Sequence, residues 1–175
     1  MRPKLGRLLL RYLAPVPEKE PTTPMRAFDE ESLDLRDTDA VLESMDLDRS
    51  IPRVAGTRGG AGEAESRLNA FLDSKLEDYE RRRSDPTTDV TSGLSPYLHF
   101  GQISPVHVAM RAAERGGPGA DAFLEELIIR RELSINFVQY NQEYDSPAGL
   151  PRWARASLSE HEADRRPYLY DVSTL

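Results

Sequence analysis

Residues 121–142 read DAFLEELIIRRELSINFVQYNQ, and this stretch decides the class of fold. Its apolar side chains fall on almost every side of the helix that their spacing predicts, which is typical of a helix enclosed by other helices. They are Phe123, Leu124, Leu127, Ile128, Ile129, Leu133, Ile135, Phe137 and Val138. Because no stretch of the sequence has a convincing strand pattern, we expect a mainly α, multi-helical fold with this helix at its centre.

Between residues 125 and 132 the same helix carries five charged residues on a surface that should be largely buried. They are Glu125, Glu126, Arg130, Arg131 and Glu132. Charges in such a position are normally paired or face a cavity. Glu126 and Arg130 are four residues apart, which is the spacing of two side chains that pair on one helix face. On spacing alone, this ion pair is favoured over the alternative that the two residues line a ligand cavity.

Three further helices are predicted around this centre. Residues 63–83 have apolar positions at helical spacing, with acidic residues early and arginines late, as the helix dipole favours. A Ser-Pro pair starts a helix over residues 105–115, and the Gly-Gly-Pro sequence that follows stops it. Residues 153–166 predict a last helix, capped near Ser157 or Ser159.

The first 62 residues have a different character. Residues 5–13 predict a short amphipathic helix, and the prolines that follow it, up to Pro24, mark a linker. An acidic stretch comes next, in which residues 41–45 predict one short helix. We therefore divide the chain into a Pro-rich and acidic linker region with short helices, residues 1–62, and a helical domain, residues 63–175.

Composition excludes several classes of function. The chain has no cysteine, which removes disulfides, thiolate catalysis and cysteine-based zinc sites. Its three histidines have no metal-ligand spacing, so no metal site is predicted. No apolar run approaches the ~20 residues that cross a bilayer. Arg11 interrupts the N-terminal leucines that would otherwise imitate a targeting signal, and we expect a cytoplasmic protein without a membrane partner.

The formal net charge of −7 is concentrated in one segment. Residues 29–49 hold nine acidic side chains against two arginines and so account for all of it. The remainder of the chain is balanced. Since nucleic-acid binding depends on a local basic face and not on the sum of charges, the acidic total does not exclude it.

The loop at residues 91–104, TSGLSPYLHFGQIS, is the second informative stretch. Gly93 lets the backbone come close to a bound group, and Thr91, Ser92 and Ser95 supply hydroxyl donors. Neighbouring backbone N–H groups can line an anion-binding concavity, so the loop suits a phosphate. Taken alone, the same residue types are equally typical of a connector between two helices.

Three segments together resemble the flavin domain of DNA photolyases and cryptochromes, and most closely that of class II cyclobutane pyrimidine dimer photolyases. They are LNAFLDSKLEDYERRRSDP (68–86), TSGLSPYLHFGQIS (91–104) and FLEELIIRRELSINF (123–137), in the family's order and spacing. Residues 2–13 resemble the end of the family's antenna domain. Class I members carry a tryptophan at the place of Ile129, so its absence agrees with class II.

The resemblance implies an FAD cofactor in an all-helical domain and light-driven electron transfer to a pyrimidine dimer flipped out of DNA. Dimer-containing DNA would be the partner. The cofactor-binding residues carried over from the family are Tyr79, Thr91, Ser92, Gly93, Leu94, Ser95 and Arg130. The loop residues among them would hold the phosphates, and Arg130 would add charge nearby. Glu126 matches the glutamate that reaches the lesion bases, and we assign it the catalytic role.

The chain also departs from the family. Ser84 stands where an asparagine is common, and no Thr-His-Asp or Trp-Asn segment of the flavin pocket follows. Trp153 is the sole tryptophan, so a relay of several tryptophans cannot operate within the chain. We expect a truncated, poorly stable domain that binds FAD weakly or not at all unless the remainder of the photolyase is its partner. The alternatives are a cryptochrome-like flavin photoreceptor and a helical interaction module without a cofactor.

Overall fold

The computed structural model describes residues 2–15, 17, 19, 20, 22, 23, 33–50, 52 and 54–172, and these contain helices but no strand. This confirms the mainly α fold. Part of the Pro-rich and acidic linker, including residues 24–32, lies outside the described residues. No helix within the described ranges is long and apolar enough to cross a membrane. The same ranges contain no group of three side chains able to hold a metal ion.

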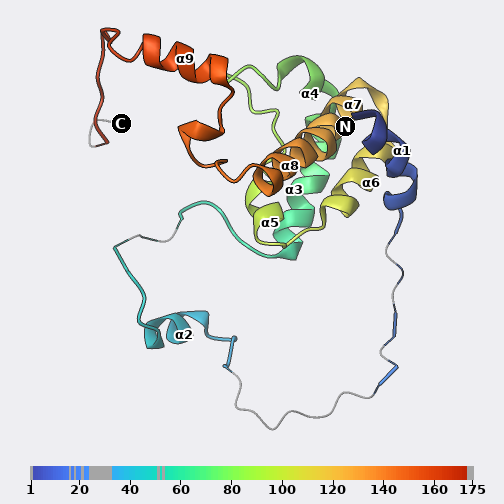
Figure 1. Cartoon of the computed structure of the whole chain (residues 1–175). Helices are drawn as coiled ribbons and strands as arrows, with labels where there is room; N and C mark the ends of the chain where they lie inside the picture. Colours follow the sequence, from blue (N-terminus) through green and yellow to red (C-terminus); the bar gives the residue numbers. More distant parts are fainter. Residues whose placement is uncertain are drawn as a thin grey trace.

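Most of the helices gather in one body (Figure 1). In chain order, the helices of the described residues are α1 (Arg2–Tyr12), α2 (Thr38–Ser44), α3 (Ala61–Ser74), α4 (Leu76–Arg82), α5 (Ser95–His99), α6 (Pro105–Arg115), α7 (Gly117–Leu124), the π-helix η1 (Glu125–Arg130), α8 (Arg131–Tyr140), the 3-10 turn η2 (Pro147–Gly149) and α9 (Arg152–Glu160). Helices α1, α2 and α6 confirm the predictions for residues 5–13, 41–45 and 105–115. The division of the chain after residue 62 stays a prediction.

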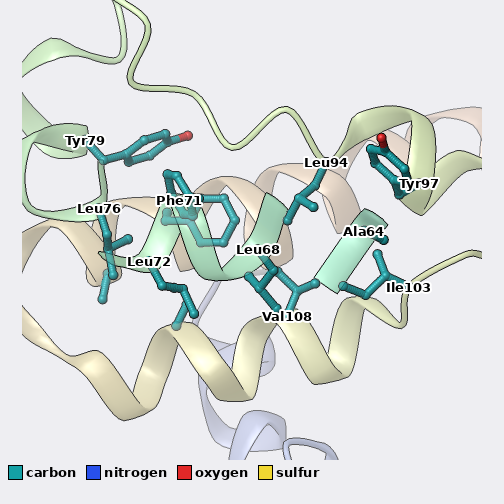
Figure 2. Close-up of a cluster of buried hydrophobic side chains, with 13 residues drawn as sticks. Ala64, Leu68, Phe71, Leu72, Leu76, Tyr79, Leu94, Tyr97, Ile103 and Val108 are labelled. Carbon is teal, nitrogen blue, oxygen red and sulfur yellow. The ribbon is translucent and has the colours of Figure 1, made fainter. Parts of the chain in front are cut away.

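The core forms around α3. Its apolar residues Ala64, Leu68, Phe71 and Leu72 follow one another at helical spacing and are all buried. Helices α4, α5, α6 and α7 and the loops between them enclose this face (Figure 2). Their buried contributions are Leu76, Tyr79, Leu94, Tyr97, Ile103, Val108, Ala112, Ala120 and Phe123. A buried side chain of the larger kind contributes about 1.5–3 kcal/mol, so this cluster supplies most of the stability of the helical body.

The predicted helix over residues 63–83 is broken in the structure. Lys75 leaves the helical conformation, with φ −122° and ψ −25°, and separates α3 from α4. The break lets α4 turn and pack against α7. Gly119 makes this packing possible, because a Cβ there would collide with the backbone carbonyl of Leu76.

Residues 117–140 form a continuous run of α7, η1 and α8. The run begins at Gly117, earlier than the predicted start near residue 121, because α6 ends at Arg115 and a single residue, Gly116 with φ +66°, separates it from α7. Pro118 then occupies the first turn of α7, where its missing N–H has no cost. The central segment is a π-helix, a variant that is often found at functional sites.

The two ends of this run are packed differently. The α7 end is enclosed, with Ala120 and Phe123 buried, whereas α8 has no buried residue. The apolar side chains of α8 are 42–50% exposed, namely Leu133, Ile135, Phe137 and Val138. The prediction of a fully enclosed helix is therefore wrong for α8 within the described residues.

The helix near the C-terminus is shorter than predicted. It spans Arg152–Glu160, and its first residue follows Pro151, which makes no side-chain capping hydrogen bond. Ser157 and Ser159 lie inside the helix, so the predicted cap at either position is wrong.

Candidate functional site

The loop at residues 91–95 is fixed to the core by one side chain. Leu94 is 1% exposed and belongs to the buried cluster, while Thr91, Gly93 and Ser95 are exposed and Ser92 is half-buried. The N–H of Leu94 donates to Oγ of Ser92 at 3.3 Å, which closes the turn. The anchor therefore leaves the hydroxyl residues Thr91 and Ser95 on the open side of the loop.

Gly93 gives the loop its shape. Its φ of +64° lies in the left-handed region, where a residue with a side chain is strained. A Cβ at Gly93 would lie 3.7 Å from Nη1 of Arg67, so the guanidinium borders the loop directly.

Arg67 itself is held from two sides. Its Nε donates to Oε1 of Glu63 at 3.0 Å, one helical turn earlier on α3. Its guanidinium carbon lies 5.6 Å from the centre of the Tyr97 ring, in a cation–π contact. Tyr97 is in turn fixed by burial and by its hydroxyl, which donates to the carbonyl of Arg58 at 2.7 Å. Sequence reasoning missed Arg67, because it lies off the apolar stripe of α3 and looks like an ordinary solvent-facing arginine.

Tyr79 belongs to the aromatic part of the buried cluster. It packs edge-to-face against Phe71 and Phe123, with ring centres 5.7 and 5.5 Å apart respectively. Figure 2 shows Tyr79 at one end of the buried cluster and Leu94 with Tyr97 at the other. Burial raises the pKa of the Tyr79 phenol; the charge of Arg83 opposes this shift and that of Glu126 adds to it. The structure thus brings Tyr79 near Arg83 and Glu126.

Glu126 is paired with a residue from another helix end. Its Oε1 accepts from Nη1 of Arg83 at 2.7 Å, and both side chains are about one third exposed, at 31% and 35%. Arg83 follows directly after α4 and belongs to the arginine run 81–83, which sequence alone does not separate from a solvated helix end. Arg81 and Arg82 do remain local, since both pair with Asp78.

The predicted ion pair between Glu126 and Arg130 is wrong. Nε of Arg130 lies instead 3.8 Å from Oε1 of Glu125, five residues earlier. The reason is the π-helix over Glu125–Arg130, which places residues five apart on one face where an α-helix places residues four apart. The Arg130 side chain is 60% exposed. Glu126 pairs with Arg83 in place of Arg130.

Comparison with known proteins gives this geometry a context. No family model matches the chain. It is 44% identical to the deoxyribodipyrimidine photo-lyase of Methanothermobacter thermautotrophicus, over 99% of this chain and 38% of that protein. It is 36% identical to the photo-lyase of Oryza sativa, over 97% of this chain and 35% of that protein. It is 34% identical to the photo-lyase of Potorous tridactylus, over 75% of this chain and 25% of that protein. The chain belongs to the deoxyribodipyrimidine photo-lyase family. It spans between a quarter and two fifths of the length of these relatives.

Within this photo-lyase segment the predicted site residues form two groups. The first is the loop from Thr91 to Ser95, with Arg67 beside it. The second is the pair of Glu126 and Arg83, with Tyr79 close enough to sense both charges. Chemically, the loop offers hydroxyl and backbone donors next to a cation, which suits an anion. The pair offers an oriented carboxylate, which suits an N–H donor.

Proposed function

We propose that this chain forms part of the flavin-binding domain of a light-driven photo-lyase that splits cyclobutane pyrimidine dimers in DNA. The observation that carries the proposal is the 44% identity, over 99% of the chain, to a protein named deoxyribodipyrimidine photo-lyase. The mainly α architecture agrees with the helical domain that the sequence resemblance implies.

The loop residues fit the diphosphate of FAD. Gly93 leaves no side chain at the point where the backbone would meet a phosphate, and its φ of +64° is the left-handed conformation that anion-binding backbone turns use. The exposed hydroxyls of Thr91 and Ser95 can donate without giving up a packing role. Leu94 holds this arrangement in place from the core. When bound, reduced FAD would supply the light-driven electron that opens the dimer.

Tyr79 and Arg130 would contribute to cofactor binding in different ways. The Tyr79 ring packs in the core, so its contribution to cofactor binding would come from its hydroxyl group. Arg130 is mostly exposed and is held only loosely by Glu125, so its guanidinium is free to turn toward a phosphate. Such a charge-assisted contact is stronger than a neutral hydrogen bond.

Glu126 is proposed to touch the substrate. A carboxylate is an acceptor that can receive the ring N–H of a pyrimidine extruded from the duplex. Arg83 fixes the Oε1 end of this carboxylate at 2.7 Å and so acts as a positioning residue.

The exposed apolar face of α8 is proposed to be covered by the remainder of a photo-lyase. Four apolar side chains of this helix are 42–50% exposed. Full burial of a side chain of this size would stabilise the fold by about 1.5–3 kcal/mol, and much of this stabilisation is missing while the side chain is exposed. We therefore expect the chain by itself to bind FAD weakly, and activity to require the rest of the fold.

The test uses a hybrid enzyme, in which this chain replaces the matching segment of the Methanothermobacter thermautotrophicus photo-lyase. The expected result is a purified hybrid that unfolds cooperatively and carries an oxidised-flavin absorption band near ~450 nm. The unmodified relative serves as the positive control. A hybrid that folds as cooperatively as the relative yet takes up no flavin would contradict the proposal and favour a helical interaction module. Flavin without dimer repair would favour a cryptochrome-like photoreceptor.

A further inference from the structure

We propose that Arg67 is a further cofactor-binding residue, whose guanidinium pairs with the diphosphate held by the loop at residues 91–95. The inference rests on the proposed flavin site and adds a residue that neither the sequence pattern nor the family resemblance singles out. Its starting point is the position of Nη1, which lies 3.7 Å from where a Gly93 side chain would begin. A group that takes the place of that missing side chain meets the Arg67 guanidinium first.

The hydrogen-bonding pattern of Arg67 leaves the required atoms available. Its ion pair with Glu63 uses Nε, and Nη1 points toward Gly93. Arg111 on α6 shows the opposite arrangement, because its Nη1 is bound to Glu65 and its Nη2 to Asn69. Arg111 therefore joins α3 to α6, whereas Arg67 presents its outer edge to the loop.

The guanidinium is also oriented before any ligand arrives. The buried ring of Tyr97 lies beneath it at 5.6 Å, and Glu63 fixes its Nε. A planar fork that is already oriented loses less conformational freedom when it binds a phosphate. The loop and Arg67 then supply the two kinds of donor that phosphate sites combine, namely backbone and hydroxyl groups with a guanidinium.

A substitution of Glu63 distinguishes phosphate binding by Arg67 from a purely structural role. If Arg67 serves only to pair with Glu63 on α3, then Arg67→Gln and Glu63→Gln both remove this ion pair and should change FAD affinity in the same direction. If Arg67 binds a diphosphate, Glu63→Gln removes a neighbouring negative charge while its amide oxygen still accepts from Nε. The two variants should then act in opposite directions on FAD affinity.

The experiment measures the dissociation constants of FAD and of riboflavin, which has no phosphate, for the apo form of the hybrid enzyme by fluorescence titration. For Arg67→Gln we expect FAD to bind about 10-fold or more weakly, as for the loss of a hydrogen bond between charged groups, with riboflavin unchanged. Arg67→Lys should lie between, since it keeps the charge and loses the fork. Glu63→Gln should bind FAD as well as the parent or better. Arg81→Gln, which removes a local ion pair to Asp78, is the matched control and should change nothing.

Three results would overturn the inference alone: equal FAD affinity in Arg67→Gln and the parent, an equal loss for riboflavin, or the same loss in Glu63→Gln. If Arg67→Gln does not fold, Arg67→Lys decides, and FAD binding unchanged in that variant counts against the fork. A folded parent hybrid that binds neither FAD nor riboflavin would instead contradict the proposed function, and the inference with it.

Discussion

Nη1 of Arg83 donates to Oε1 of Glu126 across 2.7 Å, joining the end of α4 to the π-helix η1 over a separation of 43 residues in the chain. The two side chains are about one third exposed, so the pair can be reached by a ligand. An exposed ion pair of this kind contributes little to stability, on the order of 0–1 kcal/mol. Its position matters more than its energy, because it holds the proposed substrate contact in one orientation.

Substitution of Glu126 by glutamine should impair repair and not flavin binding. The amide oxygen of glutamine can still accept, but it lacks the negative charge that strengthens the hydrogen bonds to Arg83 and to the substrate. A hydrogen bond to a charged group is worth about 1.5–3 kcal/mol. We expect light-driven repair by the hybrid enzyme to fall by about 10- to 100-fold. Arg83→Gln should reduce repair in the same direction, whereas Arg81→Gln should leave it unchanged. A Glu126→Gln enzyme as active as the parent would remove Glu126 from the catalytic role.

Substitution of Gly93 by alanine should weaken both the fold and the cofactor site. A side chain at φ +64° costs about 1–2 kcal/mol of folding free energy. Gly101→Ala is the matched control, since Gly101 has φ +66° and open space around its Cβ position. Thermal unfolding should show a similar loss in both variants, but only Gly93→Ala should lose FAD affinity. Equal flavin binding by the two variants would argue against a phosphate at Gly93.

The stability of the folded protein at alkaline pH should depend on Tyr79. Burial raises the pKa of its phenol above that of the unfolded chain, so the folded state loses its proton at higher pH than the unfolded state. The contribution of Tyr79 is therefore fully present below about pH 10 and is lost as the pH rises through the folded pKa. Urea unfolding of the hybrid between pH 8 and 11 should show a smaller alkaline loss in Tyr79→Phe than in the parent.

The exposed face of α8 should become buried only in the complete enzyme. Phe137 is 47% exposed, so Phe137→Ala should change the unfolding free energy of the chain alone by no more than about 0.5 kcal/mol. In the hybrid enzyme the same change should cost more than about 1 kcal/mol, because the added helices would cover the ring. Phe71→Ala, at a buried position, should cost about 3–5 kcal/mol in the hybrid and unfold the chain alone. An equal effect of Phe137→Ala in both proteins would mean that α8 is not covered.

Much of the fold could be predicted from local patterns. The apolar spacing of Ala64, Leu68 and Phe71 gave the buried face of α3, and the Ser104 cap gave the start of α6, where Oγ does accept from the N–H of His107. These features depend on residues within one or two turns of each other. The same kind of pattern singled out Gly93 in the loop, where φ is positive, but the close approach to a bound group that it predicts stays a prediction.

The features that the sequence did not predict depend on contacts between distant segments. The break at Lys75 is stabilised by the packing of α4 on α7, where Gly119 meets Leu76. The π-helix shifts the register of its charges by one residue, which gives Arg130 to Glu125 and frees Glu126 for Arg83. Helical periodicity counted along the chain assumes an α-helix and treats charged side chains as facing solvent. Spacing therefore predicted neither the contact of Arg130 with Glu125 nor the pair of Arg83 with Glu126.

The most direct measurement counts cyclobutane pyrimidine dimers in ultraviolet-damaged DNA before and after illumination of the reduced hybrid enzyme. Parallel samples are kept in the dark, and the unmodified Methanothermobacter thermautotrophicus enzyme is the reference. The account predicts that dimers disappear in the light and persist in the dark. With Glu126→Gln, dimers should disappear in the light at least about 10-fold more slowly than with the parent. Dimers that remain intact in the light, with a folded and flavin-loaded hybrid, would contradict it.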